Sequence, residues 1–128
     1  MFKLFVFVLI VDLTIAAGIP GGPIATNPDD EEIQNVAWKA TPNVNAEINE
    51  NYYYVPVKVT SATSQVVSGI MYRLKVIYGQ SDCLRSENLD RNQCAYNGNG
   101  NTVVYDVSLW SQPWTNFEQI TVAKEATQ

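Results

Sequence analysis

Residues 52–78, YYYVPVKVTSATSQVVSGIMYRLKVIY, decide the fold of this 128-residue chain. Residues 52–60 and 70–78 are rich in tyrosine and valine, which is typical of β-strands. The link between them, Gln65-Val66-Val67-Ser68-Gly69, ends in glycine, which readily adopts the backbone angles of a tight turn. The segment therefore predicts two strands joined in a hairpin. Because Pro56 cannot donate a backbone hydrogen bond, we expect an edge position or a bulge there.

Further strands are predicted on both sides of this hairpin. Residues 103–110 alternate, with one face made of Val103, Tyr105, Val107 and Leu109. Residues 118–123 form a last short strand, and Pro113-Trp114 lies in the turn between the two. A short strand is also expected at residues 24–26.

A helix is predicted before the first long strand. Asn27 or Asp29 can cap its start, and the carboxylates of residues 29–32 complement the helix dipole. Apolar residues then recur at the helical period and form a stripe that should lie in the core: Ile33, Val36, Ala37, Ala40, Val44 and Ile48. Pro42 interrupts the pattern, so we expect the helix to bend, or to end and restart.

These elements predict an α+β domain. A curled antiparallel sheet of four to five strands should wrap around one long N-terminal helix. The chain is long enough for one domain with one core, which we place at residues 18–128.

Residues 1–17 are predicted to be a secretory signal peptide. Lys3 precedes an apolar run from Leu4 to Val11, and small residues follow at 16–18. We place cleavage near Ala17 or Gly18, within about two residues. The alternative is an N-terminal core strand. A cleaved signal implies a secreted, extracellular protein.

Composition excludes several classes of function. The net charge is −5 and no basic stripe is present, so neither nucleic acid nor a membrane is an expected partner. The chain contains no histidine, which removes Cys-His and Ser-His-Asp catalysis and the commonest metal ligand. We expect no enzymatic activity, no cofactor and no metal. The remaining possibility for catalysis is a pair of carboxylates, and no surrounding residues in the sequence support one.

The two cysteines are Cys83 and Cys94. In an oxidising compartment, a disulfide that closes this short loop is the default interpretation. A nucleophilic thiol or half of a metal site is the alternative.

Three exposed features are not needed for the core. They are an arm with Gly21 and Gly22, the link at 65–69, and the pair Pro113-Trp114. Taken singly, each has an ordinary structural explanation: a linker, a hairpin turn, and a core tryptophan reached from a turn.

Taken together, these features resemble the cystatins of the secreted single-domain type. That family carries a glycine near the mature N-terminus, a Gln-x-Val-x-Gly hairpin loop and a Pro-Trp pair in a second hairpin. Here they read Gly21, QVVSG at 65–69, and Pro113-Trp114, in the same order and with the helix between the first two. The resemblance covers essentially the whole mature chain.

The resemblance implies a reversible, competitive, tight-binding inhibitor of papain-like cysteine proteases of the cathepsin type. The arm and both hairpins would form a wedge that enters the active-site cleft. The protease-binding residues would be Gly21, Gly22, Gln65, Val66, Val67, Ser68, Gly69, Pro113 and Trp114.

The resemblance also suggests a second site and reveals a departure. Some cystatins inhibit legumain-type proteases through an Asn in a Ser-Asn-Asp loop, and an ungapped count from Gln65 places Asn49 there. Ile48 and Glu50 replace the flanking residues, so an Asn near a helix end is the alternative. Secreted cystatins usually have two disulfides, whereas here Tyr105 stands where a third cysteine is expected. We expect this loss to lower stability rather than function.

The main rival function is a non-inhibitory extracellular module with binding or immunomodulatory activity, like cathelicidin pro-regions that reuse the fold. We expect a monomer, although a strained link at 65–69 would permit a domain-swapped dimer.

Overall fold

The computed structural model describes residues 22–125. Its sheet contains five strands in the order β1-β2-β3-β4-β5, each antiparallel to its neighbours. The strands are β1 (Ile24–Ala25), β2 (Tyr52–Val66), β3 (Ile70–Leu84), β4 (Thr102–Gln112) and β5 (Phe117–Lys124). The α+β prediction is confirmed. The predicted signal peptide and the domain boundary after residue 17 lie outside the described residues and stay predictions.

The predicted helix is divided into α2 (Glu31–Lys39) and α3 (Thr41–Glu47). Ala40 lies between them, and Pro42 falls in the first turn of α3, where a missing N–H costs little because it would have no partner within the helix. The helix therefore ends and restarts at the place that Pro42 indicates. The long N-terminal helix of the predicted fold is thus a bent helix, interrupted at Ala40.

The prediction of a side-chain cap from Asn27 or Asp29 is wrong. The N-cap residue of α2 is Asp30, whose side chain makes no capping hydrogen bond. The Asn27 side chain instead accepts a hydrogen bond from the Asp29 backbone N–H at 2.9 Å, in the turn before the helix. This local alternative competes with capping for the same side chain.

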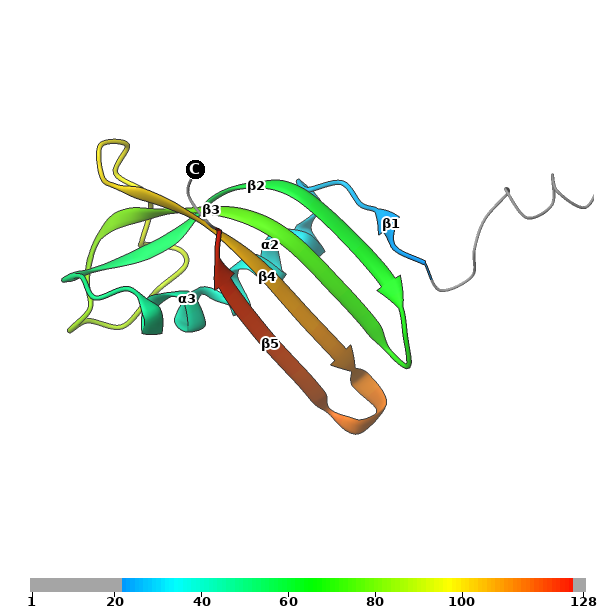
Figure 1. Cartoon of the computed structure of the whole chain (residues 1–128). Coiled ribbons are helices and arrows are strands. Elements are labelled where there is room, and N and C mark those ends of the chain that lie inside the picture. Colours follow the sequence, from blue (N-terminus) through cyan, green and yellow to red (C-terminus); the bar gives the residue numbers. More distant parts are fainter. Residues whose placement is uncertain (1–21, 126–128) are drawn as a thin grey trace, which may run out of the picture.

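Both helices lie across the concave face of the sheet, as Figure 1 shows. The predicted stripe is buried there, with at most 4% exposure from Ile33 to Val44 and partial burial at Ile48. It packs against side chains from the inner face of the strands, which include Val59, Ala62, Leu74, Val76, Tyr78, Tyr105, Val107 and Leu109. The alternation predicted for residues 103–110 is thus confirmed.

The two central strands are longer than the sequence pattern suggests. Residues 61–66 and 79–84, which are mostly polar, extend β2 and β3 beyond their apolar parts. Pro56 lies beside a shift in the β2–β3 register, on a part of β2 that β1 does not reach. Both expectations for Pro56, an edge position and a bulge, are therefore met.

Polar side chains connect the helices to the sheet at three places. Buried Asn45 of α3 donates to the Tyr54 carbonyl and accepts from the Tyr54 N–H, both at 2.8 Å. The Tyr78 hydroxyl donates to the Ala37 carbonyl at 2.8 Å, and the Tyr72 hydroxyl donates to the Glu32 carboxylate. Each bond sets the position of a helix along the strands, because it joins one helix residue to one strand residue. Apolar contacts alone would leave the helix free to slide.

A disulfide joins Cys83 and Cys94, as predicted, which excludes a free nucleophilic thiol or a metal ligand at these positions. Tyr105 is 2% exposed and packs edge-on against Tyr78, with ring centroids 6.1 Å apart. A buried aromatic pair therefore occupies the region where the resemblance places a second disulfide.

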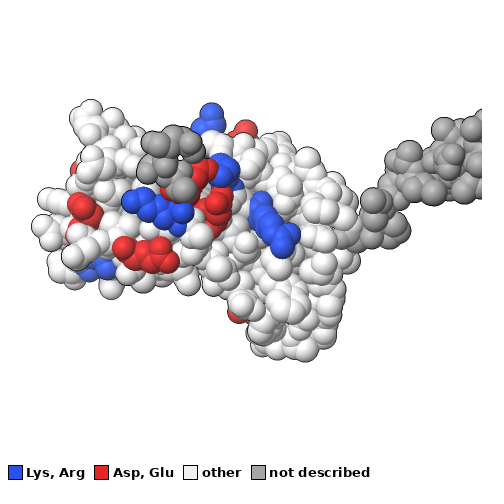
Figure 2. Space-filling model, in the orientation of Figure 1, with Lys and Arg blue, Asp and Glu red and all other residues white. Residues whose placement is uncertain are grey.

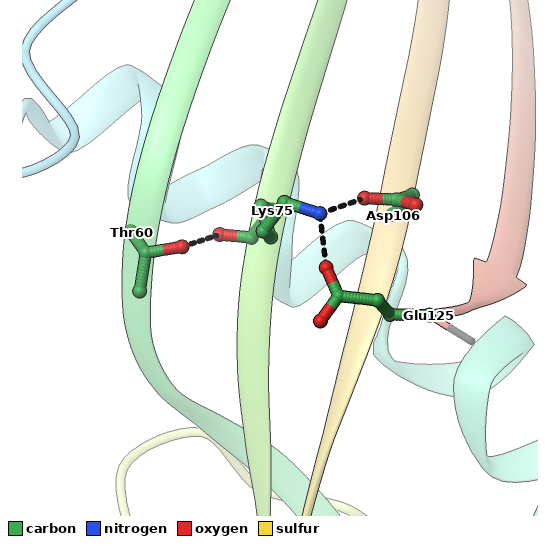
Figure 3. A network of polar contacts seen from close by, with 4 residues as sticks. All are labelled: Thr60, Lys75, Asp106 and Glu125. Atoms are coloured by element: carbon green, nitrogen blue, oxygen red, sulfur yellow. Dashed lines mark hydrogen bonds and ion pairs between the residues drawn. The ribbon is translucent and has the colours of Figure 1, made fainter. Parts of the chain in front are cut away.

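The end of β5 is held by polar contacts on the outer face of the sheet. Figure 3 shows Lys75 of β3 bound to both Asp106 and Glu125, and Thr60 bound to the Lys75 carbonyl. The Glu125 N–H also donates to the Val104 carbonyl at 2.9 Å. These contacts attach the residue that follows β5 to β3 and β4.

We predict that the protein loses stability in alkaline solution. Burial, with the bond to Glu32, raises the pKa of Tyr72 from its ordinary value of 10.0 to about 12, and burial also raises the pKa of Tyr78. A raised pKa means that the folded state favours the protonated phenols. Their contribution is complete below pH 10.0 and is lost as the pH rises through the folded pKa values.

Urea unfolding at a series of pH values measures this effect. The free energy of unfolding should fall above pH about 10, and Tyr72→Phe should reduce the slope. A stability that stays constant to pH about 12 would contradict the prediction.

Candidate functional site

The three features singled out in the sequence lie at one end of the sheet. Residues 67–69 connect β2 to β3, and the 3₁₀ turn η1 (Pro113–Thr115) connects β4 to β5 at the same end. Gly22 precedes β1, whose Ile24 pairs with Ser64 of β2 near this end. Figure 1 shows both connections side by side, and β1, which is antiparallel to β2, begins near them and runs away toward α2. Gly21 lies outside the described residues.

The link at 65–69 is a tight hairpin built on two unusual backbone conformations. Val66 pairs with Ile70, and the residues between them include Ser68 with φ 33° and Gly69 with φ 115°. The Val67 N–H donates to the Gly69 carbonyl at 2.9 Å. Gln65 accepts a hydrogen bond from Arg73 at 3.2 Å and is half-buried, so it stands at the base of the hairpin.

The hairpin is fastened to the neighbouring strand. The Gln112 side chain donates to the Ser68 carbonyl at 2.8 Å, and the Trp110 ring N–H donates to the same oxygen at 3.3 Å. Buried Gly69 lies against the backbone of Ser111. The first connection is thereby bonded to β4, the strand that carries the second connection.

The second connection presents a tryptophan to solvent. Pro113 begins η1, and Asn116 ends it in the left-handed conformation with φ 57°. The Trp114 side chain is 67% exposed, so it is not a core residue reached from a turn. This excludes the ordinary structural explanation for Trp114.

Apolar exposure is concentrated at this end of the molecule. The three most exposed large apolar side chains among residues 22–125 are Val66 at 69%, Trp114 at 67% and Ile24 at 64%, and the next reaches 41%. Val66 and Trp114 belong to two of the three features, and Ile24 lies in β1, directly after the arm. Figure 2 shows that, on this face, charged side chains gather over the middle of the sheet and leave the end with the two connections almost uncharged. Apolar groups presented in this way are typical of a protein–protein interface.

Sequence reasoning missed Ile24 and Gln112. The pattern at Ile24 predicts only a short strand, although an apolar residue directly after the glycine- and proline-rich arm is a signal of exposure. Gln112 has no pattern that predicts its bond to Ser68, because that contact joins residues 44 positions apart.

Asn49 lies at the opposite end of the sheet. It is exposed, follows α3, and lines a groove of about 630 Å³ with Tyr54, Thr102 and Tyr105. The structure does not bring Asn49 near the other predicted site residues. Among residues 22–125 no group of His, Cys, Asp and Glu side chains could hold a metal ion.

A cystatin domain model matches residues 21–126. The chain belongs to the cystatin family. It is 33% identical to cystatin cpi-1 of Caenorhabditis elegans, over 92% of this chain and 91% of that protein. It is 32% identical to L-cystatin of Tachypleus tridentatus, over 89% of this chain and 88% of that protein. Cystatins are cysteine protease inhibitors rather than enzymes, so the chain is an inhibitor of this general class and not an enzyme.

The fold of a solved cystatin agrees with this assignment. The salivary cystatin of the soft tick Ornithodoros moubata superposes with a TM-score of 0.72 at 23% identity, over 84% of this chain and all of that chain. No helix formed by residues 22–125 has the length and apolar character needed to span a bilayer.

We predict that Gly69 is essential for the shape of the first connection. A Cβ atom at Gly69 would lie 2.3 Å from the Ser111 carbonyl oxygen, at a φ that other residues rarely adopt. Gly69→Ala should therefore lower the urea midpoint and displace the hairpin. Gly98 is a matched control, since it also has a positive φ, 87°, but open space around the new methyl group.

The comparison separates two costs. Gly98→Ala should cost about 1–2 kcal/mol from backbone conformation alone, and Gly69→Ala should cost more because of the clash. Equal losses of stability in the two variants would show that the contact with Ser111 relaxes freely.

Proposed function

We propose that this cystatin is a reversible, competitive inhibitor of papain-like, cathepsin-type proteases. The observation that carries the proposal is the grouping of Ile24, Val66 and Trp114, the three most exposed large apolar side chains, on three elements at one end of the sheet. Exposed apolar side chains grouped in this way suit burial in the cleft of a partner protein. The binding residues would be Gly21 and Gly22 in the arm, residues 65–69 of the link, and Pro113-Trp114.

Each element has a distinct part in this mechanism. Val66 and Val67 fill the cleft beside the catalytic thiol, and Trp114 buries its ring on the leaving-group side. The arm before Gly21 occupies the subsites for the residues that precede a cut, and Gly21 bends the chain so that no peptide bond is presented for attack. The complex is therefore non-covalent and reversible.

The hydrogen bonds that hold the 65–69 hairpin in the free protein support tight binding. The bonds from Gln112 and Trp110 to Ser68 hold the hairpin before it meets the protease, so little conformational entropy is lost on association. Exposed apolar side chains then supply the burial, and a tryptophan alone can bury about 150–250 Å².

We also propose that the protein is secreted. The predicted signal at residues 1–17 and the disulfide between Cys83 and Cys94 support this, because such bonds persist in oxidising compartments.

Trp114→Ala should weaken inhibition of papain by roughly 30-fold or more, because removing an aromatic anchor from an interface costs about 2 kcal/mol or more. Titration of papain with the purified variants measures the inhibition constant. Trp38→Ala is the matched control, since Trp38 is half-buried on α2 beneath Arg91, whose guanidinium carbon lies 5.5 Å from the ring centroid.

The control should leave inhibition unchanged. Equal weakening by both variants, or none by Trp114→Ala, would contradict the wedge. Absence of inhibition by the unmutated protein would instead favour the non-inhibitory extracellular module.

A second activity, against legumain-type proteases, is proposed for Asn49. Its exposure and its distance along the sheet from Trp114 support an independent site. Asn49→Ala should abolish legumain inhibition and leave the constant for papain unchanged, and Asn43→Ala, at an exposed position of α3, serves as the control. If both variants inhibit legumain equally, Asn49 is only a residue near a helix end.

A further inference from the structure

The two edges of the sheet differ in how they are protected. On the β2 edge, β1 covers Thr63 and Ser64, Pro56 interrupts the backbone donors, and the β2–β3 register shifts at three places. Irregularities of this kind prevent another strand from adding to an edge.

In the part of the chain that the structure describes, the β5 edge has none of these devices. Its eight residues pair with β4 in continuous register from Phe117 to Lys124, and they contain no proline. Within residues 22–125 no strand pairs with the outer side of β5, and Figure 1 shows it as the last strand of the sheet. Six of its eight residues are exposed. A regular row of backbone donors and acceptors is therefore available to a further strand.

The sequence of β5, FEQITVAK, is complementary to itself when two copies run antiparallel about Thr121. This register places Glu118 opposite Lys124 of the second copy, and the symmetry repeats the pair at the other end. Ile120 then lies opposite Val122, again twice. Opposite charges and apolar pairs across strands are stabilising, so the pattern favours a second copy of this chain.

The apolar pair lies on the face of the sheet that packs on the helices. Ile120 pairs with Leu109 and Val122 pairs with Val107, both of which are buried. Ile120 and Val122 are themselves only half-buried, at the border of the core. A second strand beside β5 would cover both side chains and extend the core across the junction.

We propose that two copies of the protein associate through their β5 edges and form one continuous antiparallel sheet. Glu118 is already bound to Lys39 of α2 at 2.5 Å, but its side chain is 41% exposed and can accept a second cation. Because one strand per copy forms a small interface, the association is weak and depends on concentration.

In this dimer the proposed protease-binding end of each copy stays accessible, which distinguishes it from a domain-swapped dimer. The strands run antiparallel, so the ends that carry Val66 and Trp114 point away from each other and stay uncovered. Exchange through the link at 65–69 would instead open that hairpin.

Sedimentation velocity over a series of concentrations tests the proposal with four variants. Glu118→Lys and Lys124→Glu each create two like-charge pairs and should weaken association roughly tenfold. The double variant E118K/K124E restores opposite charges in the same register and should recover the dimer. Lys39→Gln removes the existing partner of Glu118 and should not weaken association. Circular dichroism verifies that each variant is folded.

Rescue by the double variant supports the antiparallel register about Thr121. The proposal is overturned by a protein that stays monomeric at every soluble concentration. Single variants that associate like the unmutated protein, or a double variant that does not recover the dimer, would also overturn it. So would a Lys39→Gln variant that weakens association as much as Glu118→Lys. A dimer that does not dissociate on dilution would indicate domain swapping and would overturn the proposal as well.

Discussion

The structure depends on burial of the helical stripe in the concave face of the sheet. Helices α2 and α3 together offer one apolar face, and only a sheet that curves can cover it from Ile33 to Ile48. The restart at Ala40 lets the helical segment bend with the sheet, while Val44 still donates its backbone N–H to the Ala40 carbonyl at 3.0 Å. The bonds of Tyr78 and Asn45 then set where along the sheet the helices lie.

The same curvature positions the functional end. Because β2, β3 and β4 cross the helices together, the connections at 67–69 and 113–115 emerge side by side at the far end of the sheet. The contacts of Ser68 and Gly69 with residues 110–112 join the first connection to β4, which leads into the second. The hydrophobic core therefore supports the protease-binding proposal without contributing a side chain to it.

The lack of a second disulfide is accommodated by ordinary packing. Tyr105 fills its position in the core and contacts Tyr78, while Lys75, Glu125 and Val104 attach the end of β5. Such contacts act in the folded state, whereas a disulfide acts largely by restricting the unfolded chain.

The sequence by itself determined the elements, because hydrophobic period and glycine or proline positions are local properties. The α+β class, the break that Pro42 indicates, the Cys83–Cys94 bond and the inner face of β4 were all readable in this way. Only the tertiary structure decided that Ile24 joins Val66 and Trp114 at one end, that Gln112 fastens Ser68, and that β5 has a regular open edge. Each of these depends on strand register between residues far apart in the chain, which curvature and packing of the whole sheet select and no local pattern encodes.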